Sequence, residues 1–250
     1  MTDDLFRQDA YLRECSAHIT AVTDAGIVLD RTVFYPLGGG QAGDSGVLVL
    51  ADGTEIAIAD TRKGKDAEGN ATSDIVHVPA PGQEALLATL TPGTAASARI
   101  DWERRHRMMR LHTTSHLLCH VVPQLVNGCS ITPDYARLDF AMTDPLDKEQ
   151  LTAAIATLVA AAHPLTVASI SDEELDANPA LVKSMSVQPP RGTGRIRTIR
   201  IGGEGDAPLI DLQPCGGTHV ANTAEIGAIV VTKIEKKSAT TRRVVLGFVP

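Results

Sequence analysis

A glycine-rich segment, residues 38–43 (GGGQAG), matches the spacing G-x-G-x-x-G and bears directly on which folds are open to this chain. In dinucleotide-binding folds this spacing follows a strand and opens a helix, whose N-terminus binds the pyrophosphate. Here the glycines lead through residues 44–46 (DSG) into VLVLADG, a strand pattern that ends in a turn. No helix pattern follows, and no Lys-Ser/Thr pair completes a phosphate-binding loop. The segment argues against a doubly wound nucleotide-binding fold, and we expect neither a dinucleotide cofactor nor ATP.

Short strand patterns dominate residues 15–80. SAHITAVT and GIVLDRTVFY flank an Asp-Ala-Gly turn signal, and GVLVL and EIAIAD flank ADGT, whose Asp-Gly pair is typical of a hairpin. KGKDAEGNATSD is predicted to be a polar loop and IVHVPA a further strand, while LTPGTAASARI is predicted to lead into a second domain. Several short strands at this spacing indicate a small barrel. We assign this barrel to residues 1–95.

Residues 96–250 combine helix and strand patterns. The segment DWERRHRMMRLHTTSHLLCHVVPQLV predicts a long helix, with Asp101 as its N-cap and no breaker before Pro123. A second helix fits residues 147–163 and is ended by Pro164. LTVASI, GRIRTIRI, AIVVTKIEKKS and RRVVLGFV are strand-like. The predicted fold class is therefore α+β, in which the small N-terminal barrel is followed by a two-layer domain whose helices cover one face of an antiparallel sheet.

Two short motifs carry metal-ligating side chains in pairs. His112 and His116 (HTTSH) lie four residues apart on the long predicted helix, so both imidazoles can point at a single ion. Cys215 and His219 (CGGTH) lie in a loop whose Gly-Gly pair lets the backbone turn tightly. Three imidazoles and one thiolate are a ligand set suited to tetrahedral zinc. The two motifs together predict a Zn²⁺ site.

Each motif taken alone is also compatible with ordinary core or surface histidines, so the combination carries the prediction. Thr113 occupies the position of the glutamate in the H-E-x-x-H metalloprotease motif, and a zinc peptidase would therefore lack its general base. Cys119 lies ~10 Å along the helix axis from His112, so it cannot join both histidines on one ion. We expect Cys119 to be a buried apolar thiol, and the same interpretation applies to Cys15 and Cys129.

Nothing in the sequence indicates a membrane or secreted protein. No apolar run approaches the ~20 residues that a membrane-spanning helix needs. The N-terminal residues MTDDLFRQDAYLREC lack the basic and apolar regions of a signal peptide. The four cysteines are too sparsely spaced for a disulfide framework. We expect a cytoplasmic protein without a membrane partner.

Basic residues are unevenly distributed in a chain whose formal net charge is −7. Residues 1–98 carry 6 Lys/Arg and 14 Asp/Glu, whereas residues 99–250 carry 17 and 16. Fifteen of those 17 basic residues lie in three segments, 99–110, 183–200 and 233–243. If the fold brings these segments together, they form a phosphate-binding surface. The alternative is that each segment is an ordinary solvated face.

Three longer stretches together resemble alanyl-tRNA editing proteins. They are FYPLGGGQAGDSG, DWERRHRMMRLHTTSHLL and DLQPCGGTHVANTAEIGAIVVTKIEKKS followed by RR, and they occur in the order of that family between residues 30 and 245. The chain is similar to the free-standing AlaX-type proteins of medium size and to the editing region of alanyl-tRNA synthetase. Threonyl-tRNA synthetase carries a related editing domain, but the FYP-GGGQ stretch points to the alanyl branch.

The resemblance implies a trans-editing hydrolase that removes a wrong amino acid, chiefly serine and secondarily glycine, from alanine tRNA at a zinc site. An alanine pocket cannot strongly reject an isostere that only adds a hydroxyl, so a second, hydrolytic site is needed. Zinc would activate a water, polarise the ester or position the terminal ribose, and no catalytic residue is assigned. The candidates for tRNA binding are Arg104, Arg105, Arg107, Lys236, Lys237, Arg242 and Arg243.

Two regions are candidates for substrate binding. By resemblance, polar residues beside the second histidine and after the long helix recognise the substrate, which suggests Ser115 and Thr132. The glycine-rich segment is either a turn between barrel strands or a loop over the zinc site, in which Gln41 hydrogen-bonds the substrate. Its candidate residues are Gly38, Gly39, Gly40 and Gln41. The alternative function is a non-catalytic, zinc-containing tRNA-binding module, and a generic zinc esterase would leave the basic segments unexplained.

Overall fold

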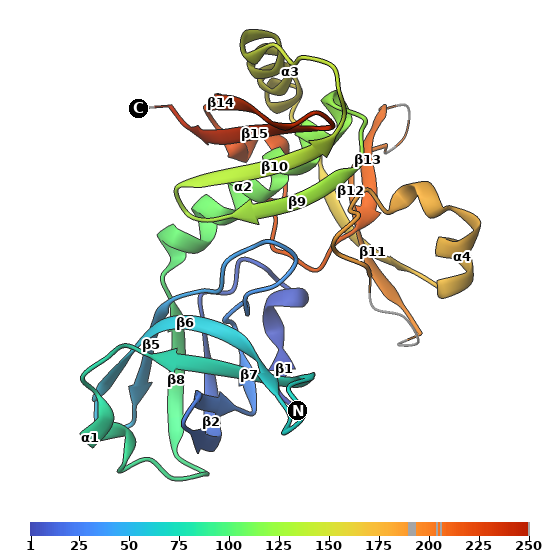
Figure 1. The fold of residues 1–250 in the computed structure, drawn as a ribbon. Coiled ribbons are helices and arrows are strands. Elements are labelled where there is room, and N and C mark those ends of the chain that lie inside the picture. Colours follow the sequence, from blue (N-terminus) through green and yellow to red (C-terminus); the bar gives the residue numbers. More distant parts are fainter. Residues whose placement is uncertain (190–193, 204, 206, 250) are drawn as a thin grey trace. The chain divides into compact units, whose positions relative to one another are not determined.

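The fold is shown in Figure 1, a computed structural model that describes residues 1–189, 194–203, 205 and 207–249. The chain divides into two compact units. The first unit comprises Met1–Gly38 and Ala42–His106, and the second comprises Gly39–Gln41 and the chain from Arg107 onward. Both units contain antiparallel sheets, and the second adds long helices, so the predicted α+β class is confirmed.

The first unit is built around six strands that close into a barrel (Figure 1). In barrel order they are β2 (Glu14–Thr23), β3 (Gly26–Leu29), β7 (Ala71–Pro79), β6 (Glu55–Lys65), β5 (Gly46–Leu50) and β8 (Ala95–Ile100). Neighbouring strands pair antiparallel. The small elements outside the barrel are β1 (Asp3–Asp4) paired in parallel with β4 (Arg31–Thr32), η1 (Leu5–Arg7) and α1 (Glu84–Leu87). Aliphatic side chains and one phenylalanine fill the interior, among them Ile19, Ile27, Leu29, Phe34, Leu48, Ile56 and Ala98.

The first unit differs from the prediction at two places. The predicted polar loop at residues 63–74 is largely strand, because β6 and β7 extend through it and turn over residues 66–70, where Asp66 accepts backbone hydrogen bonds from Glu68 and Asn70. Residues 95–100 form β8, which pairs with both β2 and β5 and so completes the barrel. For this reason the units divide between His106 and Arg107 rather than between residues 95 and 96.

The second unit contains two antiparallel sheets rather than the single predicted one. The four-stranded sheet has the order β14 (Ile229–Ser238), β15 (Thr241–Phe248), β10 (Tyr135–Ala141) and β9 (Val126–Ile131). The three-stranded sheet has the order β11 (Leu165–Ile170), β12 (Ile196–Gly202) and β13 (Leu209–Pro214). The predicted strands LTVASI and GRIRTIRI pair with each other in this smaller sheet and do not join the larger one. The short elements are α4 (Asp172–Ala177), η2 (Pro179–Leu181) and η3 (Thr223–Ile226).

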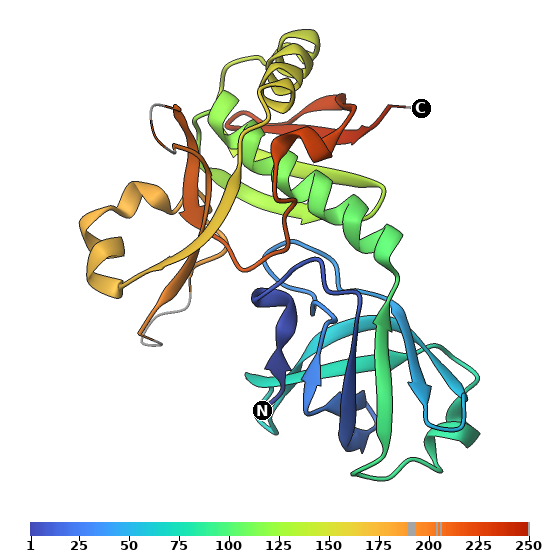
Figure 2. The same ribbon diagram turned by 180° about the vertical axis from the view of Figure 1, so that it is seen from behind.

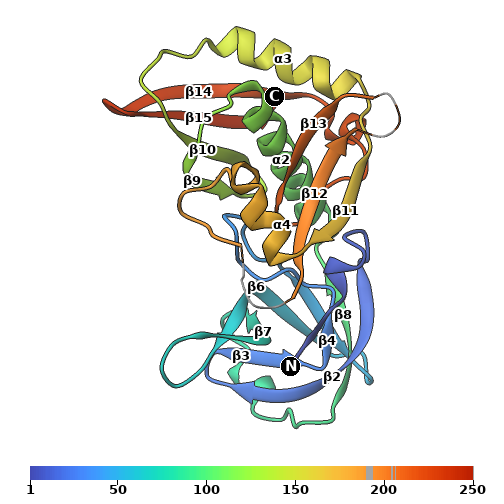
Figure 3. The same ribbon diagram turned by 90° about the vertical axis from the view of Figure 1, so that its right-hand side faces the viewer.

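Two helices pack on the four-stranded sheet, as the sequence pattern indicates. Helix α2 (Trp102–Val121) runs along the sheet (Figures 1 and 2), and Arg107 and Arg110 lie over the Phe248 ring of β15. Helix α3 (Lys148–Ala160) lies along β14 (Figure 3), where Thr152 Oγ1 accepts a hydrogen bond from the Val231 backbone at 3.1 Å. The two helices thereby bury the apolar side of the sheet.

The predicted start of α2 is confirmed, whereas α3 ends earlier than predicted. Asp101 Oδ1 accepts a hydrogen bond from the Arg104 backbone N–H at 3.1 Å, which is the N-cap interaction. Asp147 caps α3 in the same way, but the helix ends at Ala160, because Ala162 adopts a positive φ of 53° before Pro164 is reached. Within the described part of the chain, the helices are too short or too polar to cross a membrane.

A buried histidine makes the stability of the first unit depend on pH. His77 is fully buried in the barrel, where its Nδ1 bonds to the Ile27 carbonyl at 3.1 Å and its Nε2 bonds to Thr32 Oγ1 at 2.8 Å. Burial lowers the pKa of His77 from 6.5 to about 4. As the pH falls, His77 therefore binds a proton in the unfolded chain before it does so in the folded chain. The stability that is present above pH 6.5 is consequently lost as the pH falls toward about 4.

We expect the free energy of unfolding of the full chain to fall by about 2 kcal/mol more in wild type than in His77→Gln when the pH is lowered from about 7 to about 5. The glutamine side chain cannot take up a proton, so the variant lacks this contribution. Urea unfolding at both pH values measures the difference. The control is His120→Gln, which removes an exposed histidine at the end of α2 and should keep most of the wild-type pH dependence. An equal pH dependence in His77→Gln and wild type would contradict the prediction.

Candidate metal centre

The second unit brings together all four residues that the sequence predicts as metal ligands. One ligand atom each from His112, His116, Cys215 and His219 lies within 4.8 Å of every other. Cys215 Sγ is 3.5 Å from His112 Nε2 and 3.3 Å from His219 Nε2. The three imidazoles are at most 6% exposed. The cluster is a compact, buried group of three nitrogen donors and one sulfur donor, a set that can hold a metal ion.

The cluster forms because a helix and a tight loop approach each other very closely. His112 and His116 lie one turn apart on α2, while Cys215 and His219 belong to the loop after β13. A Cβ atom at Gly217 would lie 2.1 Å from Cε1 of His112, so only glycine fits there. Arg197 Nη1 donates to the carbonyls of Cys215 and Gly217 at 2.6 and 3.1 Å and braces the loop.

A different polar group contacts the Nδ1 atom of each imidazole. Gln41 Oε1 lies 2.8 Å from His112 Nδ1, and Thr113 Oγ1 lies 3.2 Å from His219 Nδ1. Asp211 Oδ2 lies 2.7 Å from His116 Nδ1, and Gln213 Nε2 lies 3.0 Å from the same atom. Hydrogen bonds at the second ring nitrogen fix the orientation of histidines that bind metals. The arrangement around the cluster is therefore the one expected of a metal centre.

Charge within the cluster favours the metal-binding form of the cysteine. Burial alone would raise the pKa of the Cys215 thiol, but the adjacent imidazoles of His112 and His219 outweigh it and hold this pKa well below its usual value. Burial lowers the pKa of His219 to about 3, whereas the pKa of the equally buried His116 is raised to about 9 by its hydrogen bond with Asp211 and by the adjacent Cys215. A thiolate and a neutral imidazole are the forms that bind metal ions.

The tip of the glycine-rich segment belongs to the second unit and contacts the cluster. Gly40 and Gln41 lie beside the end of β9, where Gln41 forms a parallel bridge with Ile131 and the Gly40 carbonyl accepts from the Ile131 N–H at 2.8 Å. Gly39 and Gly40 have φ values of 57° and 86°, which favour glycine. This segment is therefore a defined loop at the cluster rather than a plain turn between barrel strands.

Gln41 holds protein groups rather than presenting its amide to solvent. Its side chain is fully buried, and Oε1 accepts from His112 Nδ1 and from the Thr218 backbone N–H, at 2.8 and 3.1 Å. Its Nε2 donates to Thr218 Oγ1 at 2.8 Å. Both polar ends of the amide are thus used within the second unit. Gly38 belongs to the first unit, where its carbonyl accepts from the Tyr35 hydroxyl at 2.8 Å.

The two other substrate-binding candidates make local hydrogen bonds. Ser115 is buried on α2, and its hydroxyl donates to the Leu111 carbonyl one turn earlier at 2.9 Å. Thr132 follows β9, donates to the Tyr135 carbonyl at 3.1 Å and accepts from the backbone of Asp134 and Tyr135. Each hydroxyl proton is therefore used to stabilise a helix or a turn.

Arg105 is an internal ion-pair residue, in contrast to its predicted role at a tRNA surface. Its side chain is 0% exposed and forms a salt bridge with Asp44, which is 1% exposed. Its Nη1 and Nη2 also donate to the carbonyls of Ala10 and Val33 at 3.0 and 2.7 Å. Arg104 donates to the Gly43 carbonyl at 3.2 Å. The helical spacing could not reveal that Arg105 points into the first unit.

The basic candidates of the second unit differ in how accessible they are. Arg107 donates to the Pro133 carbonyl at 2.8 Å, and the 8% exposed Arg242 donates to the carbonyls of Ser238, Thr241 and Thr143. Arg243 forms a two-pronged pair with Asp139 at 2.7 and 2.9 Å. The exposed residues of the set are Lys236 and Lys237 on β14. Arg191, in the basic segment 183–200, lies outside the described residues.

Several residues around the cluster carry no metal-ligand motif, so sequence reasoning does not single them out. They are Asp211 and Gln213 on β13, Lys183 and Thr113. Asp211 and Gln213 are two residues apart on the strand that leads into Cys215. This spacing of polar residues beside a metal-ligand motif is the signal by which the sequence could have indicated them. The prediction for Cys119 is confirmed, since this thiol is 6% exposed and burial raises its pKa to about 12.

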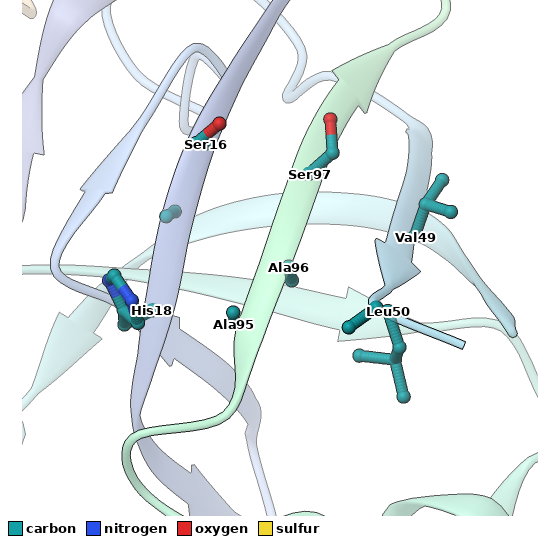
Figure 4. Close-up of a pocket in the computed structure, with 9 residues that line it drawn as sticks. Ser16, His18, Val49, Leu50, Ala95, Ala96 and Ser97 are labelled. Atoms are coloured by element: carbon teal, nitrogen blue, oxygen red, sulfur yellow. The ribbon is translucent and has the colours of Figure 1, made fainter. Parts of the chain in front are cut away.

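A separate hollow of about 310 Å³ lies on the first unit (Figure 4). Its walls come from β2, β5 and β8, and its polar side chains are Ser16, His18 and Ser97. His18 is the only titratable side chain among the lining residues. The lining residues therefore contain no cluster of metal ligands.

Comparison with known proteins identifies relatives along the whole chain. The family described as "Threonyl and Alanyl tRNA synthetase second additional domain" matches residues 196–245, and "tRNA synthetases class II (A)" matches residues 8–104. The chain is 34% identical over 249 residues to an alanine–tRNA ligase of Hyperthermus butylicus, of which it covers 24%.

Free-standing relatives match over nearly their full length. The chain is 32% identical over 248 residues to the alanyl-tRNA editing protein AlaX-M of Saccharolobus solfataricus, with 98% of each chain covered. It is also 32% identical over 254 residues to the AlaX-M protein of Methanosarcina acetivorans, with 97% of each covered. These relatives match both the barrel unit and the unit that holds the His/Cys cluster. The chain therefore belongs to the AlaX-M family of alanyl-tRNA editing proteins.

Proposed function

We propose that this protein is a zinc-dependent aminoacyl-tRNA deacylase, which hydrolyses seryl-tRNA(Ala) and secondarily glycyl-tRNA(Ala). The observation that carries the proposal is the buried cluster of His112, His116, Cys215 and His219, in a chain whose relatives are named alanyl-tRNA editing proteins. Free-standing editing of this kind corrects a tRNA that a synthetase has already released.

The donor set fits zinc. Zinc takes nitrogen and sulfur donors in tetrahedral sites, and the cluster offers three imidazoles, one thiolate and hydrogen bonds at each Nδ1 atom. When bound, zinc supplies a Lewis acid that can polarise an oxygen or orient a nearby group. Four protein donors fill a tetrahedral shell, which favours an organising role.

The reaction we propose is hydrolysis of the ester that joins the amino acid to the terminal ribose of the tRNA. The oxygen of a water molecule bonds to the carbonyl carbon, the carbon–oxygen bond to the ribose breaks, and the ribose oxygen takes up a proton. The products are the free amino acid and the uncharged tRNA. Such a second site is needed because a pocket for alanine cannot strongly reject serine.

The residues of the chain hold the reaction site in a fixed shape. Gln41 and Thr113 orient two of the imidazoles, and the positive φ values of Gly39 and Gly40 place the backbone of the glycine-rich loop beside the cluster. We propose that this backbone, rather than the Gln41 amide, contacts the aminoacyl end. The oxygens of Ser115 and Thr132 can still accept a hydrogen bond, and we retain both as candidates for recognising the serine hydroxyl.

Deacylation of a panel of charged tRNAs tests the function. Purified protein is mixed with seryl-, glycyl- and alanyl-tRNA(Ala), and with seryl-tRNA(Ser) as a control for tRNA identity. We expect the seryl ester on tRNA(Ala) to be lost faster than in buffer, and the alanyl ester to survive. Tight tRNA binding without any turnover would instead support a non-catalytic binding module.

Exposed lysines on β14 are proposed to contact the tRNA phosphates. Lys236 and Lys237 are exposed, whereas Arg242 and Arg243 are engaged within the protein. We expect the double variant Lys236→Gln/Lys237→Gln to bind tRNA more weakly. The slope of log affinity against log salt should fall by about 2, because each phosphate contact contributes about 1.

Filter binding or fluorescence anisotropy at several salt concentrations measures both the affinity and the slope. The matched control is Lys148→Gln, an exposed lysine at the start of α3. An unchanged slope in the double variant would contradict the assignment of these two lysines.

A further inference from the structure

Asp211, a buried carboxylate next to His116, differs from the other groups that contact the histidines because it forms an ion pair. Asp211 lies on β13 and is 2% exposed. Its Oδ2 accepts from His116 Nδ1 at 2.7 Å and from Gln213 Nε2 at 2.8 Å. Its Oδ1 forms a salt bridge with Lys183 Nζ. Asp211 is therefore the one anion that supports an imidazole of the cluster within the described residues.

The charge of Asp211 favours one tautomer of His116. Asp211 is buried, its Oδ1 is paired with the Lys183 ammonium and its Oδ2 accepts from the Gln213 amide, an environment that suits an ionised carboxylate. An ionised carboxylate only accepts hydrogen bonds. Both the Asp211 carboxylate and the Gln213 amide nitrogen contact His116 Nδ1, at 2.7 and 3.0 Å, and the charged acceptor favours the tautomer with the proton on Nδ1. The lone pair of Nε2 then remains available to a metal.

The other two imidazoles are supported by neutral groups. Gln41 contributes an amide oxygen and Thr113 a hydroxyl, and a hydroxyl can either donate or accept. Burying a carboxylate is costly unless it is paired, and here Lys183 and Gln213 satisfy the oxygen lone pairs that His116 leaves free. The three groups form a complete network around one carboxylate, which holds it in a single orientation.

We infer that Asp211 is a positioning residue, which sets the tautomer and orientation of His116 for metal binding, with Lys183 holding the carboxylate in place. The inference rests on the proposed zinc centre. Asp211 touches neither the metal nor the substrate, so its effect must appear in metal affinity as well as in deacylation.

Asp211→Asn tests the inference with a side chain of the same shape. The charged Lys183 Nζ can only donate, so it attracts the oxygen of the introduced amide and leaves the amide nitrogen facing His116 and Gln213. The neutral Gln213 amide can turn to present its own oxygen to that nitrogen. That nitrogen donates, so His116 Nδ1 must accept and the proton moves to Nε2, which can then no longer bind the metal. We expect zinc affinity to fall about 10- to 100-fold, the usual cost of losing such a partner.

Zinc affinity is measured by competition with a chromophoric chelator, and the His116 tautomer by ¹⁵N NMR of histidine-labelled protein. Asp139→Asn is the matched control, because Asp139 is also paired with a cation, Arg243, but lies on β10 away from the histidines' hydrogen bonds. We expect this control to keep the zinc affinity of wild type.

A double variant tests whether Lys183 orients the introduced amide. In Asp211→Asn/Lys183→Met the amide is free to turn its oxygen toward His116, so we expect the double variant to bind zinc more tightly than Asp211→Asn. Wild-type zinc affinity together with a wild-type tautomer in Asp211→Asn would overturn the inference. If the wild-type protein bound no zinc, the proposed zinc centre itself would be rejected. If wild type and Asp211→Asn bound zinc equally tightly, only the role of Asp211 would be rejected.

Discussion

Replacing Cys215 by alanine is expected to abolish deacylation and to lower zinc affinity by more than about 100-fold. Removing a residue that hydrogen-bonds to a metal ligand lowers metal affinity about 10- to 100-fold. Cys215 is proposed as a direct ligand, so its removal should lower the affinity further. Its Sγ lies 3.3 to 3.5 Å from two imidazole nitrogens, and Cys215 is the only thiol in the ligand cluster that the described residues form. The remaining three histidines would leave an open position.

The measurement pairs bound zinc per protein with the rate of loss of the seryl ester. Cys15→Ala is the matched control, because Cys15 is a free cysteine on β2 of the first unit. It should leave both quantities unchanged. Full retention of zinc and activity in Cys215→Ala would rule out the cluster as the reaction site. Loss of zinc with retained activity would separate the metal from the chemistry.

Replacing Arg105 by methionine is expected to destabilise the protein by about 3–5 kcal/mol, the usual effect of removing one partner of a buried ion pair. The variant leaves the Asp44 carboxylate, 1% exposed, without its cation. It also removes the hydrogen bonds to the Ala10 and Val33 carbonyls. The Tyr35 backbone N–H, at 2.7 Å from Asp44, cannot replace the lost charge.

Urea unfolding of the full chain measures this effect. The control Arg62→Met removes an exposed arginine that pairs with Asp60 at 2.8 Å, and it should change stability by less than about 1 kcal/mol. Arg105→Met/Asp44→Asn should recover part of the loss, because no unpaired charge remains. If Arg105→Met instead kept full stability and weakened tRNA binding, the assignment of Arg105 to the tRNA surface would be correct.

Two strands of the second unit, β9 and β10, and the second half of β6 are not among the predicted strands. In β10 buried and less buried residues alternate strictly (YARLDFA), so its signal is present. In contrast, β9 (VNGCSI) and the second half of β6 carry polar and glycine residues, and they are strands because their backbones pair with β10 and β7. The division of the strands of the second unit between two sheets depends on which strands pair, and residue patterns do not specify pairing.

The candidate site divides in the same way. His112 and His116 share one side of α2, and Cys215 and His219 share one loop, because spacing along a helix or a tight turn is local. The partners of the three imidazoles lie 71, 106 and 95 residues from their histidines. No local rule connects Gln41 to His112 or Asp211 to His116. Their roles follow from burial and hydrogen bonding in the folded unit.

Local motifs are enough to predict the four candidate metal ligands, the start of the long helix and the family resemblance. Each of these depends on residues that are neighbours along the chain. The contact of the Gln41 amide with His112, the contact of Asp211 with His116 and the burial of Arg105 beside Asp44 are evident only in the folded chain. The physical reason is that a polar side chain far from its partner in sequence acquires its role when folding removes it from water and leaves one group with which it can bond.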